Sequence, residues 1–201
     1  MRGAAMTLLV STLAMVLAVA GGIALALARL YAPRAVQLVA QAYVEVYRGT
    51  PVLLQLYVLY YGLAPLIRLD AITAAIVGLG MNYAAYEAEV YRAGIQAVPP
   101  GQMEAALSLG MTTPLALRRV LLPQAFRLAL PNVTNDFIAL LKDSSLVSVI
   151  TVVELTKQMT ITAVDLRSWL WPGLACAGLY FCMSFPLSRL SKRLEERMAR
   201  G

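Results

Sequence analysis

The stretch GAAMTLLVSTLAMVLAVAGGIALALA, residues 3–28, is a run of 26 uncharged residues between Arg2 and Arg29. About 20 apolar residues in a helix are enough to cross the hydrocarbon core of a bilayer. Only 14% of the 201 residues are charged and 60% are hydrophobic. In soluble domains about a quarter of all residues are charged. The sequence therefore predicts an all-helical integral membrane protein.

Four further segments are candidates for crossing the membrane. Residues 49–67 and 168–188 are also free of charged side chains. Residues 71–93 and 123–143 include charged side chains, and such polar content is typical of helices that line a cavity rather than face lipid. We predict five transmembrane helices within one domain over 4–192, at about residues 4–30, 51–67, 71–93, 123–143 and 168–190.

The distribution of Lys and Arg predicts the orientation of these helices. If the N-terminus lies outside, the inside segments 29–50, 92–127 and 189–201 hold 3, 4 and 5 of the 17 basic residues. Cytoplasmic loops of membrane proteins carry an excess of such residues. We expect an outside N-terminus, a cytoplasmic segment over 100–122 and a basic cytoplasmic tail over 193–201. The net charge of +6 is then a topology signal, and no nucleic-acid partner is expected.

An alternative interpretation of residues 1–30 is a secretory signal, with Ala26-Leu27-Ala28 as the cleavage motif. The apolar run is about twice the 7–15 residues of a signal peptide's apolar core. A first transmembrane helix is therefore the preferred interpretation.

The segment EAALSLG, residues 104–110, lies on the predicted cytoplasmic side. It predicts a short helix that ends at Gly110, which can adopt the left-handed conformation common after a helix C-terminus. Glu104 lies near the helix start, where the helix dipole favours a negative charge. Ala105 and Ala106 leave a slim surface that can enter a groove of a soluble partner.

This segment also carries a family resemblance. Residues 104–123 read Glu-Ala-Ala, three residues, Gly, nine residues, an aliphatic residue, one residue and Leu-Pro, which resembles the permease subunits of ATP-binding cassette importers. Three further stretches, over 43–56, 82–95 and 135–146, look like the polar amino acid permeases. The resemblance implies a type I importer permease fold and docking of the Glu104, Ala105, Ala106 and Gly110 positions onto an ATPase.

The resemblance also implies the partners. They are cytoplasmic ATPase subunits, a second permease copy or paralogue, an extracytoplasmic amino acid-binding protein and the lipid of the cytoplasmic (inner) membrane, which a multi-pass chain would span. The chain has no Gly-x-x-x-x-Gly-Lys-Ser/Thr sequence that could cradle ATP phosphates. We therefore expect a transport subunit that is not an enzyme and binds no cofactor, with ATP and Mg²⁺ held by the partner.

Polar side chains of the third span are candidates for a substrate path. Asn82, Tyr86 and Glu89 share one helical face, and Tyr83 and Glu87 form a neighbouring stripe. Intramembrane carboxylates usually face a cavity, a partner charge or another subunit. Glu89 lies close enough to the cytoplasmic end to pair locally, whereas for Asn82 and Glu87 cavity lining and a structural role both remain open.

The fourth span carries a second polar stripe, in which Asn132, Asp136, Ala139 and Asp143 follow helical spacing, with Ser144 directly after. A zwitterionic amino acid needs acceptors for its ammonium group and donors for its carboxylate. The two aspartates could accept from the ammonium group, and Ser144 or the polar groups of the third span could donate. Alternatively, Asp143 marks a helix end and Asp136 bonds across a dimer.

The sequence thus predicts an ATP-driven importer subunit for polar amino acids, and the two aspartates favour a basic one. An ion-coupled secondary amino acid transporter is the alternative, since intramembrane carboxylates suit it. It would be unusual without an inverted repeat. A membrane enzyme is disfavoured, because the chain has no histidine, no metal-ligand cluster and no nucleophile–base pair.

Overall fold

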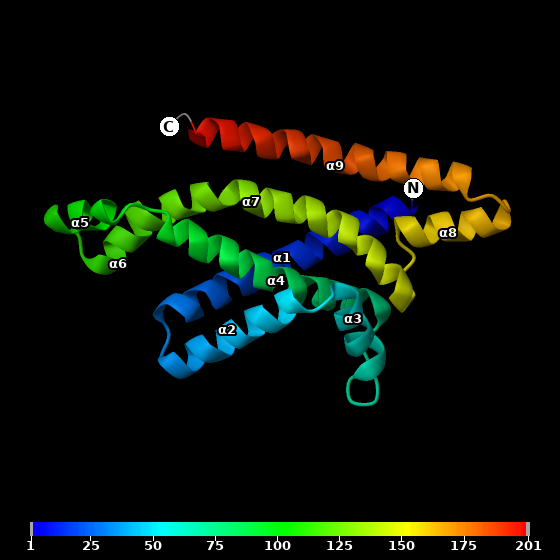
Figure 1. Ribbon diagram of the computed structural model, residues 1–201, viewed down its shortest axis with the longest axis horizontal. Coiled ribbons are helices and arrows are strands. Elements are labelled where there is room, and N and C mark those ends of the chain that lie inside the picture. The colour runs from blue at the N-terminus through cyan, green and yellow to red at the C-terminus, as the bar shows by residue number, and fades with distance from the viewer. Residues whose placement is uncertain (1, 200–201) are drawn as a thin grey trace.

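The computed structural model describes residues 2–199, with side chains up to Glu196, and every regular element in that range is a helix. Three long helices form the centre of the fold: α1 (Arg2–Tyr31), α4 (Ala71–Gln96) and α7 (Leu122–Asp143) (Figure 1). A fourth long helix, α9 (Leu170–Ala199), lies along the outside of α7. The predicted all-helical architecture is confirmed.

Shorter helices connect the long ones. In chain order they are α2 (Arg34–Gly49), α3 (Val52–Tyr57), the π-helical η1 (Val58–Gly62), α5 (Pro100–Ser108), α6 (Thr113–Ala116), the π-helical η2 (Leu117–Leu121), the 3₁₀-helical η3 (Ser144–Ile150) and α8 (Leu155–Asp165). The helices α5 and α6 lie at the same end of the molecule as the C-terminal end of α9 (Figure 1). The helix α8 lies at the opposite end, beside the beginning of α1.

The closest helix packing is between α1 and α4, and small residues make it possible. A Cβ atom added to Gly22 of α1 would lie 2.4 Å from the Cβ atom of Glu87, and one added to Gly80 of α4 would lie 2.7 Å from Leu17 Cδ2. In membranes, association depends on such close fit, because lipid tails are as apolar as the side chains they replace. The two glycines therefore fix how α4 is placed against α1.

One apolar core joins α1, α4, α7 and η3. Its fully buried members include Val10, Ala14, Leu79, Leu140, Val147 and Ile150. The core lies in the half of the fold that holds η3. It holds the C-terminal end of α7 against the N-terminal half of α4, and this arrangement positions the polar residues described below.

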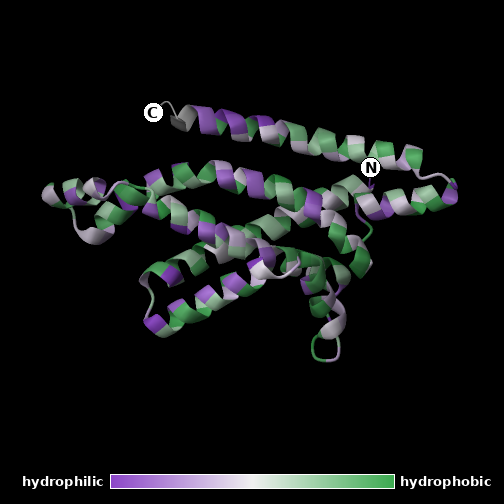
Figure 2. Cartoon of the chain, viewed as in Figure 1, coloured by the Kyte–Doolittle hydropathy of each residue, from purple (hydrophilic) through white to green (hydrophobic). Residues whose placement is uncertain are grey.

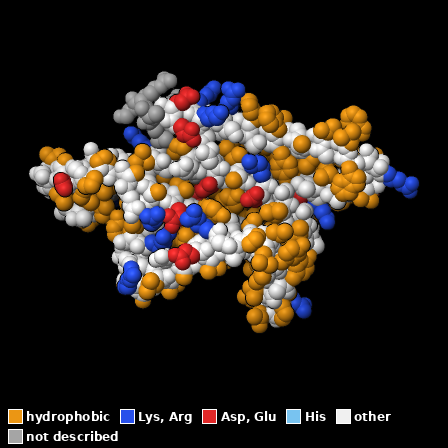
Figure 3. Space-filling model, viewed as in Figure 1, with side chains coloured by type: hydrophobic (Ala, Val, Ile, Leu, Met, Phe, Trp, Pro, Cys, Tyr) orange, Lys and Arg blue, Asp and Glu red, His pale blue; other side chains and the backbone are white. Residues whose placement is uncertain are grey.

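The outer surface is apolar over wide areas. Hydrophobic residues predominate in the half of α9 that lies next to α8 (Figure 2), and orange side chains cover large parts of the face in Figure 3. Large exposed side chains include Val16 at 63% and Trp171 at 71% of their full accessible area. Contiguous apolar surface of this kind is typical of lipid-facing or subunit-facing helices.

The helix bounds differ from the predicted spans at several ends. The helix of the second span ends at Gly62 instead of continuing to 67, and that of the third extends to Gln96. The fourth helix starts ten residues before 123, because α6, η2 and α7 follow one another without a break from Thr113. Pro123 does not interrupt it, since a π-helical turn just before it can absorb the missing N–H.

The predicted tail over 193–201 is not a separate segment where it is described, because α9 continues through it to Ala199. Charged residues mark a membrane boundary without ending a helix. Residues 200–201 lie outside the described range. Two helices within residues 2–199, Arg2–Tyr31 and Leu170–Glu196, are long and apolar enough to cross a membrane by themselves. The count of five crossings therefore stays a prediction.

Candidate functional site

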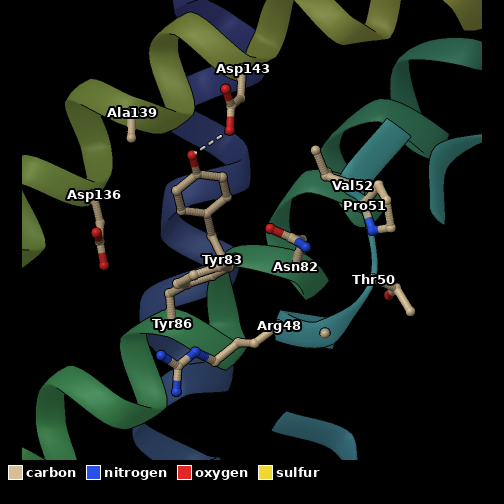
Figure 4. A pocket seen from close by; sticks show the side chains of 11 residues that line it. Arg48, Thr50, Pro51, Val52, Asn82, Tyr83, Tyr86, Asp136, Ala139 and Asp143 are labelled. Atoms are coloured by element: carbon tan, nitrogen blue, oxygen red, sulfur yellow. Dashed lines mark hydrogen bonds between the residues drawn. The ribbon is translucent and has the colours of Figure 1, made fainter. Parts of the chain in front are cut away.

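A pocket of about 470 Å³ opens between the α2–α3 junction, α4 and α7. This volume falls within the range of about 300–1,000 Å³ typical of small-molecule sites. Figure 4 shows the pocket with its polar groups on facing elements. The lining residues are Arg48, Gly49, Thr50, Pro51, Val52, Asn82, Tyr83, Tyr86, Asp136, Ala139 and Asp143.

The α2–α3 junction brings a basic side chain to the pocket. α2 ends at Gly49, and Thr50 and Pro51 are extended before α3 begins. The side-chain amide of Gln55 holds this turn by donating to the Tyr47 and Thr50 carbonyl oxygens, at 2.9 and 3.1 Å. Arg48 is therefore placed at the end of α2, beside α4.

Two tyrosines and an asparagine come from α4. The Tyr83 hydroxyl donates to Asp143 Oδ2 at 2.8 Å, which joins α4 to the end of α7. The side-chain amide of Asn82 donates to Gln55 Oε1 at 3.0 Å and to the Tyr47 carbonyl oxygen at 3.2 Å. Asn82 therefore braces the junction, while Tyr83 orients a carboxylate.

The Arg48 guanidinium lies among an aromatic ring and a cluster of charges. Its Cζ atom is 5.5 Å from the centre of the Tyr86 ring, a cation–π distance. Its Nη1 atom is 4.0 Å from Glu89 Oε1. Glu89 also accepts from Arg29 and, at 2.6 and 3.0 Å, from Arg92. The Glu89 carboxylate thus already has two arginine partners, and Arg48 keeps donors for a ligand.

The α7 carboxylates face these groups from the other side. Asp136 and Asp143 line the pocket with Ala139 between them, as the helical spacing predicted. Asp136 has no hydrogen bond or ion pair with any residue in the described range, and it lines the same pocket as Arg48. The pocket therefore has one arginine on one side and two carboxylates on the other.

Five of the eight predicted substrate-site residues meet in this pocket: Asn82, Tyr83, Tyr86, Asp136 and Asp143. Three do not line it. Glu87 is fully buried behind it, Asn132 is exposed elsewhere on α7, and the Ser144 hydroxyl is buried and donates to the Leu141 carbonyl at 2.8 Å. The hydroxyl donor of Ser144 is therefore already used in a hydrogen bond within the chain.

Sequence reasoning missed Arg48. The sequence analysis assigned it to no site, although it directly precedes the helix-breaking Gly49-Thr50-Pro51 turn. The signal that could have identified Arg48 is a cationic residue next to a break between two helices. A turn at such a break can direct the side chain toward neighbouring helices.

The predicted coupling segment is a helix, α5, at the end of the molecule. Glu104, Ala105 and Gly110 are exposed and Ala106 is buried. Gly110 has a positive φ of 79°, as predicted. The Gly110 and Met111 N–H groups donate to carbonyls of the last helical turn at 2.9 and 3.1 Å, which is the Schellman arrangement. The expectation that Ala106 belongs to the docking surface is therefore wrong, because its side chain packs inside the fold, and the exposed surface of this segment is formed by Glu104, Ala105 and Gly110.

The family model of the "binding-protein-dependent transport system inner membrane component" matches residues 4–200. The chain belongs to this family. Among its curated relatives, the probable amino-acid permease protein YxeN of Bacillus subtilis is 38% identical over 198 residues, which are 96% of this chain and 88% of that protein. The arginine transport system permease protein ArtQ of the same organism is 33% identical over 200 residues, which are 98% of this chain and 91% of that protein.

Solved structures agree with this assignment. An amino acid ABC transporter crystallised with histidines has a chain that is 43% identical, with a TM-score of 0.91 over 98% of this chain and 92% of that one. A chain of the MetNI methionine ABC transporter is 21% identical and has a TM-score of 0.69 over 94% of this chain and 91% of that one. This similarity supports the fold alone.

The permease is therefore a multi-pass inner-membrane subunit of an ABC amino acid importer, and it is not an ATPase itself. ATP is bound by the ATPase subunits with which it works. The ion-coupled alternative is wrong, because the family is powered through a separate subunit.

Proposed function

We propose that the permease translocates a basic amino acid through the pocket between the α2–α3 junction, α4 and α7. The observation that carries the proposal is the arrangement of opposite charges across one open cavity, with Arg48 on one side and Asp136 and Asp143 on the other (Figure 4). A zwitterion needs this arrangement, since its carboxylate and ammonium groups require partners of opposite sign.

In this proposal, Arg48 binds the substrate carboxylate. Its guanidinium offers five N–H donors in a planar fork that suits a carboxylate, and the Tyr86 ring holds its plane. Asp143, oriented by Tyr83, accepts from the α-ammonium group with its second oxygen. Asp136 is then left for a second positive charge, and this favours an amino acid with a cationic side chain.

We also propose the five-span topology with an outside N-terminus. It is supported by the distribution of basic residues and by the arrangement in which α5 and α6 share one end of the fold with the end of α9. In this topology the pocket lies within the membrane-spanning part and α5 reaches into the cytoplasm.

Docking of α5 onto an ATPase subunit is the proposed route of coupling. α6, η2 and α7 are continuous, so a displacement of the segment after Gly110 would be carried along one helical rod to Asp136 and Asp143. The proposed assembly has two permease chains, two ATPase subunits and an extracytoplasmic binding protein.

The substrate site is tested by equilibrium binding of labelled arginine to the purified complex of permease and ATPase subunits. Arg48→Gln is expected to weaken binding by about 10-fold or more, because charge-assisted hydrogen bonds are lost. Arg34→Gln, on the same helix α2 but outside the pocket, is the matched control. Equal affinities of both variants and the unaltered protein would refute the site.

Coupling is tested with two glycines of the same segment. Gly110→Asp and Gly101→Asp add the same charge to exposed positions, but only Gly110 has a left-handed backbone. Gly110→Asp is expected to abolish co-purification with the ATPase or arginine uptake, while Gly101→Asp retains both. Retained complex and uptake in Gly110→Asp would contradict the docking role.

A further inference from the structure

A second cavity, an apolar groove of about 260 Å³, lies between α1, α4 and the beginning of α7. Its floor consists of small buried side chains, among them Ala26 and Ala125. The floor is shallow because α4 and α7 are in close contact here: a Cβ atom added to Gly94 would lie 2.9 Å from the Ala125 carbonyl oxygen. The groove is therefore a permanent feature of how these helices pack.

The walls of the groove are large apolar side chains that the rest of the fold leaves uncovered. Ile23 and Leu27 of α1 form one wall, and Leu122 and Phe126 of α7 form the other. Between 42% and 58% of the accessible area of these four residues is exposed. An open apolar groove between helices of a membrane protein is a surface for lipid or for another protein chain, because water would not wet it favourably.

The groove has the length of a lipid chain. Ile23 also lines a larger apolar groove, of about 710 Å³, which continues between α1, α7 and α9 as far as Phe137. From Leu122 to Phe137 the axis of α7 advances about 22 Å, whereas one leaflet of the hydrocarbon core is about 15 Å thick. The two grooves together are therefore long enough to take a whole acyl chain.

Two arginines lie directly before the groove. Arg118 and Arg119 are in η2, which continues into α7 without a break, so they precede Leu122 by about one helical turn. Both are exposed, and neither forms an ion pair with a side chain that the structure describes. The ion pairs at this end of α1 and α4 all go to Glu89. The guanidinium groups of the two arginines therefore keep their donors for another partner.

We propose that the groove binds an anionic phospholipid, whose acyl chain lies between the α1 and α7 walls and whose phosphate is bound by Arg118 and Arg119. Charge complementarity selects this occupant, since guanidinium groups bind phosphate through paired hydrogen bonds. A zwitterionic lipid has the same phosphate but brings a cation toward the two arginines. In the proposed topology the site faces the cytoplasmic leaflet, where basic sites between membrane helices bind anionic headgroups.

The test places a tryptophan in the groove. Phe126→Trp is made in the complex of permease and ATPase subunits, which is reconstituted into bilayers containing lipids brominated on their acyl chains. Bromine quenches a tryptophan that the chain contacts, so titration gives the relative affinities of phosphatidylglycerol, which is anionic, and phosphatidylcholine, which is zwitterionic. The unaltered complex gives the quenching of all other tryptophans. Phe181→Trp, also exposed but in the middle of α9, is the matched control.

Phe126→Trp is expected to report a preference for phosphatidylglycerol of about 10-fold or more, and Phe181→Trp a ratio near one. Adding Arg118→Gln or Arg119→Gln to Phe126→Trp is expected to lower the preference about 5-fold each, because each basic residue near anionic lipid contributes separately. Arg68→Gln removes the same charge from the exposed connection before α4 and is expected to leave the preference unchanged.

Three results would overturn the inference. Equal lipid ratios at the two tryptophan positions would show that the groove does not select anionic lipid. A preference that persists in both arginine variants would show that the headgroup is held elsewhere. The absence of quenching by either lipid in Phe126→Trp would show that protein, such as a second copy of the chain, covers the groove. Leu122→Trp gives the same readout if Phe126→Trp does not assemble.

Discussion

Glu89 and Glu87 are two residues apart on α4, but their surroundings are opposite. Glu89 is near the end of the helix and receives Arg29 and Arg92, with Arg48 at 4.0 Å. Glu87 faces the interior between α1 and α7 and has no hydrogen-bond partner among the described side chains. The Glu89 carboxylate therefore holds three helices together. The Glu87 carboxylate would not be retained for its contribution to stability alone.

The physical reason for the difference is the balance between desolvation and pairing. A buried charge without a partner is destabilising, whereas an ion pair with several hydrogen bonds can offset its desolvation. Natural proteins keep destabilising groups mainly where function requires them. Glu89 is therefore interpreted as a residue that stabilises the fold, whereas the buried carboxylate of Glu87 is expected to lower its stability.

The largest expected effect is the loss of the Glu89 cluster. Glu89→Gln would leave three arginines close together without their common anion, and we expect a loss of about 3 kcal/mol of stability. The thermal denaturation midpoint of the purified permease measures it. Glu45→Gln is the control, because Glu45 bonds only Gln41 on an exposed face. An unchanged midpoint in Glu89→Gln would contradict the structural role.

The second prediction concerns the close approach that buries Glu87. Gly22→Ala would place a Cβ atom 2.4 Å from Glu87 Cβ, and the forced separation of α1 and α4 is expected to cost about 2 kcal/mol. Gly173→Ala in α9 meets nothing within 4 Å and is expected to be neutral. Equal denaturation midpoints for the two variants would argue against tight packing here.

The third prediction reverses the sign of the first. Glu87→Met replaces an unpartnered carboxylate by an apolar side chain of similar length, and we expect it to raise stability by about 1 kcal/mol. Glu89→Met, made in parallel, should lower it. If both variants shift the denaturation midpoint in the same direction, the contrast between the two carboxylates is wrong.

The smallest expected effect is at Asp70, the exposed carboxylate that caps the start of α4. It accepts from the Ile72 and Thr73 N–H groups at 3.1 and 3.0 Å, and its bonds with Thr73 chiefly hold its pKa below the ordinary value of 3.8. A lowered pKa stabilises the fold above pH 3.8, and this stabilisation is lost as the pH falls further. Asp70→Ala should therefore lower the denaturation midpoint slightly at pH 7 and have less effect near pH 3. A difference that persists unchanged at acidic pH would contradict this capping role.

Helical periodicity was sufficient to predict much of the site. Tyr83 on α4 and Asp143 on α7 were each on a predicted polar stripe, and the structure joins them by a hydrogen bond. Gly110 was predicted to be left-handed from its position after a helical stretch, and its φ of 79° agrees. Both predictions depend on residues within one or two turns, where sequence spacing fixes the geometry.

Other features could not be predicted from spacing. Arg48 reaches the pocket because the Gly49-Thr50-Pro51 turn directs the end of α2 toward α4, and the direction of a turn depends on its tertiary contacts. Glu87 was a candidate for lining the path, with a structural role left open, and the contact with Gly22 packs its Cβ atom against α1. A helical stripe does not by itself specify which neighbour it meets.

The sequence by itself determined the helical membrane architecture, the family and the short helix that ends before the left-handed Gly110, because uncharged length, charge distribution and local spacing are properties of consecutive residues. Only the tertiary structure decided that Glu89 is shared by arginines of three helices while Glu87 is left without a partner. The reason is that pairing in a membrane depends on which helix faces approach, and α1 and α4 are brought together by glycine contacts between residues far apart in the chain.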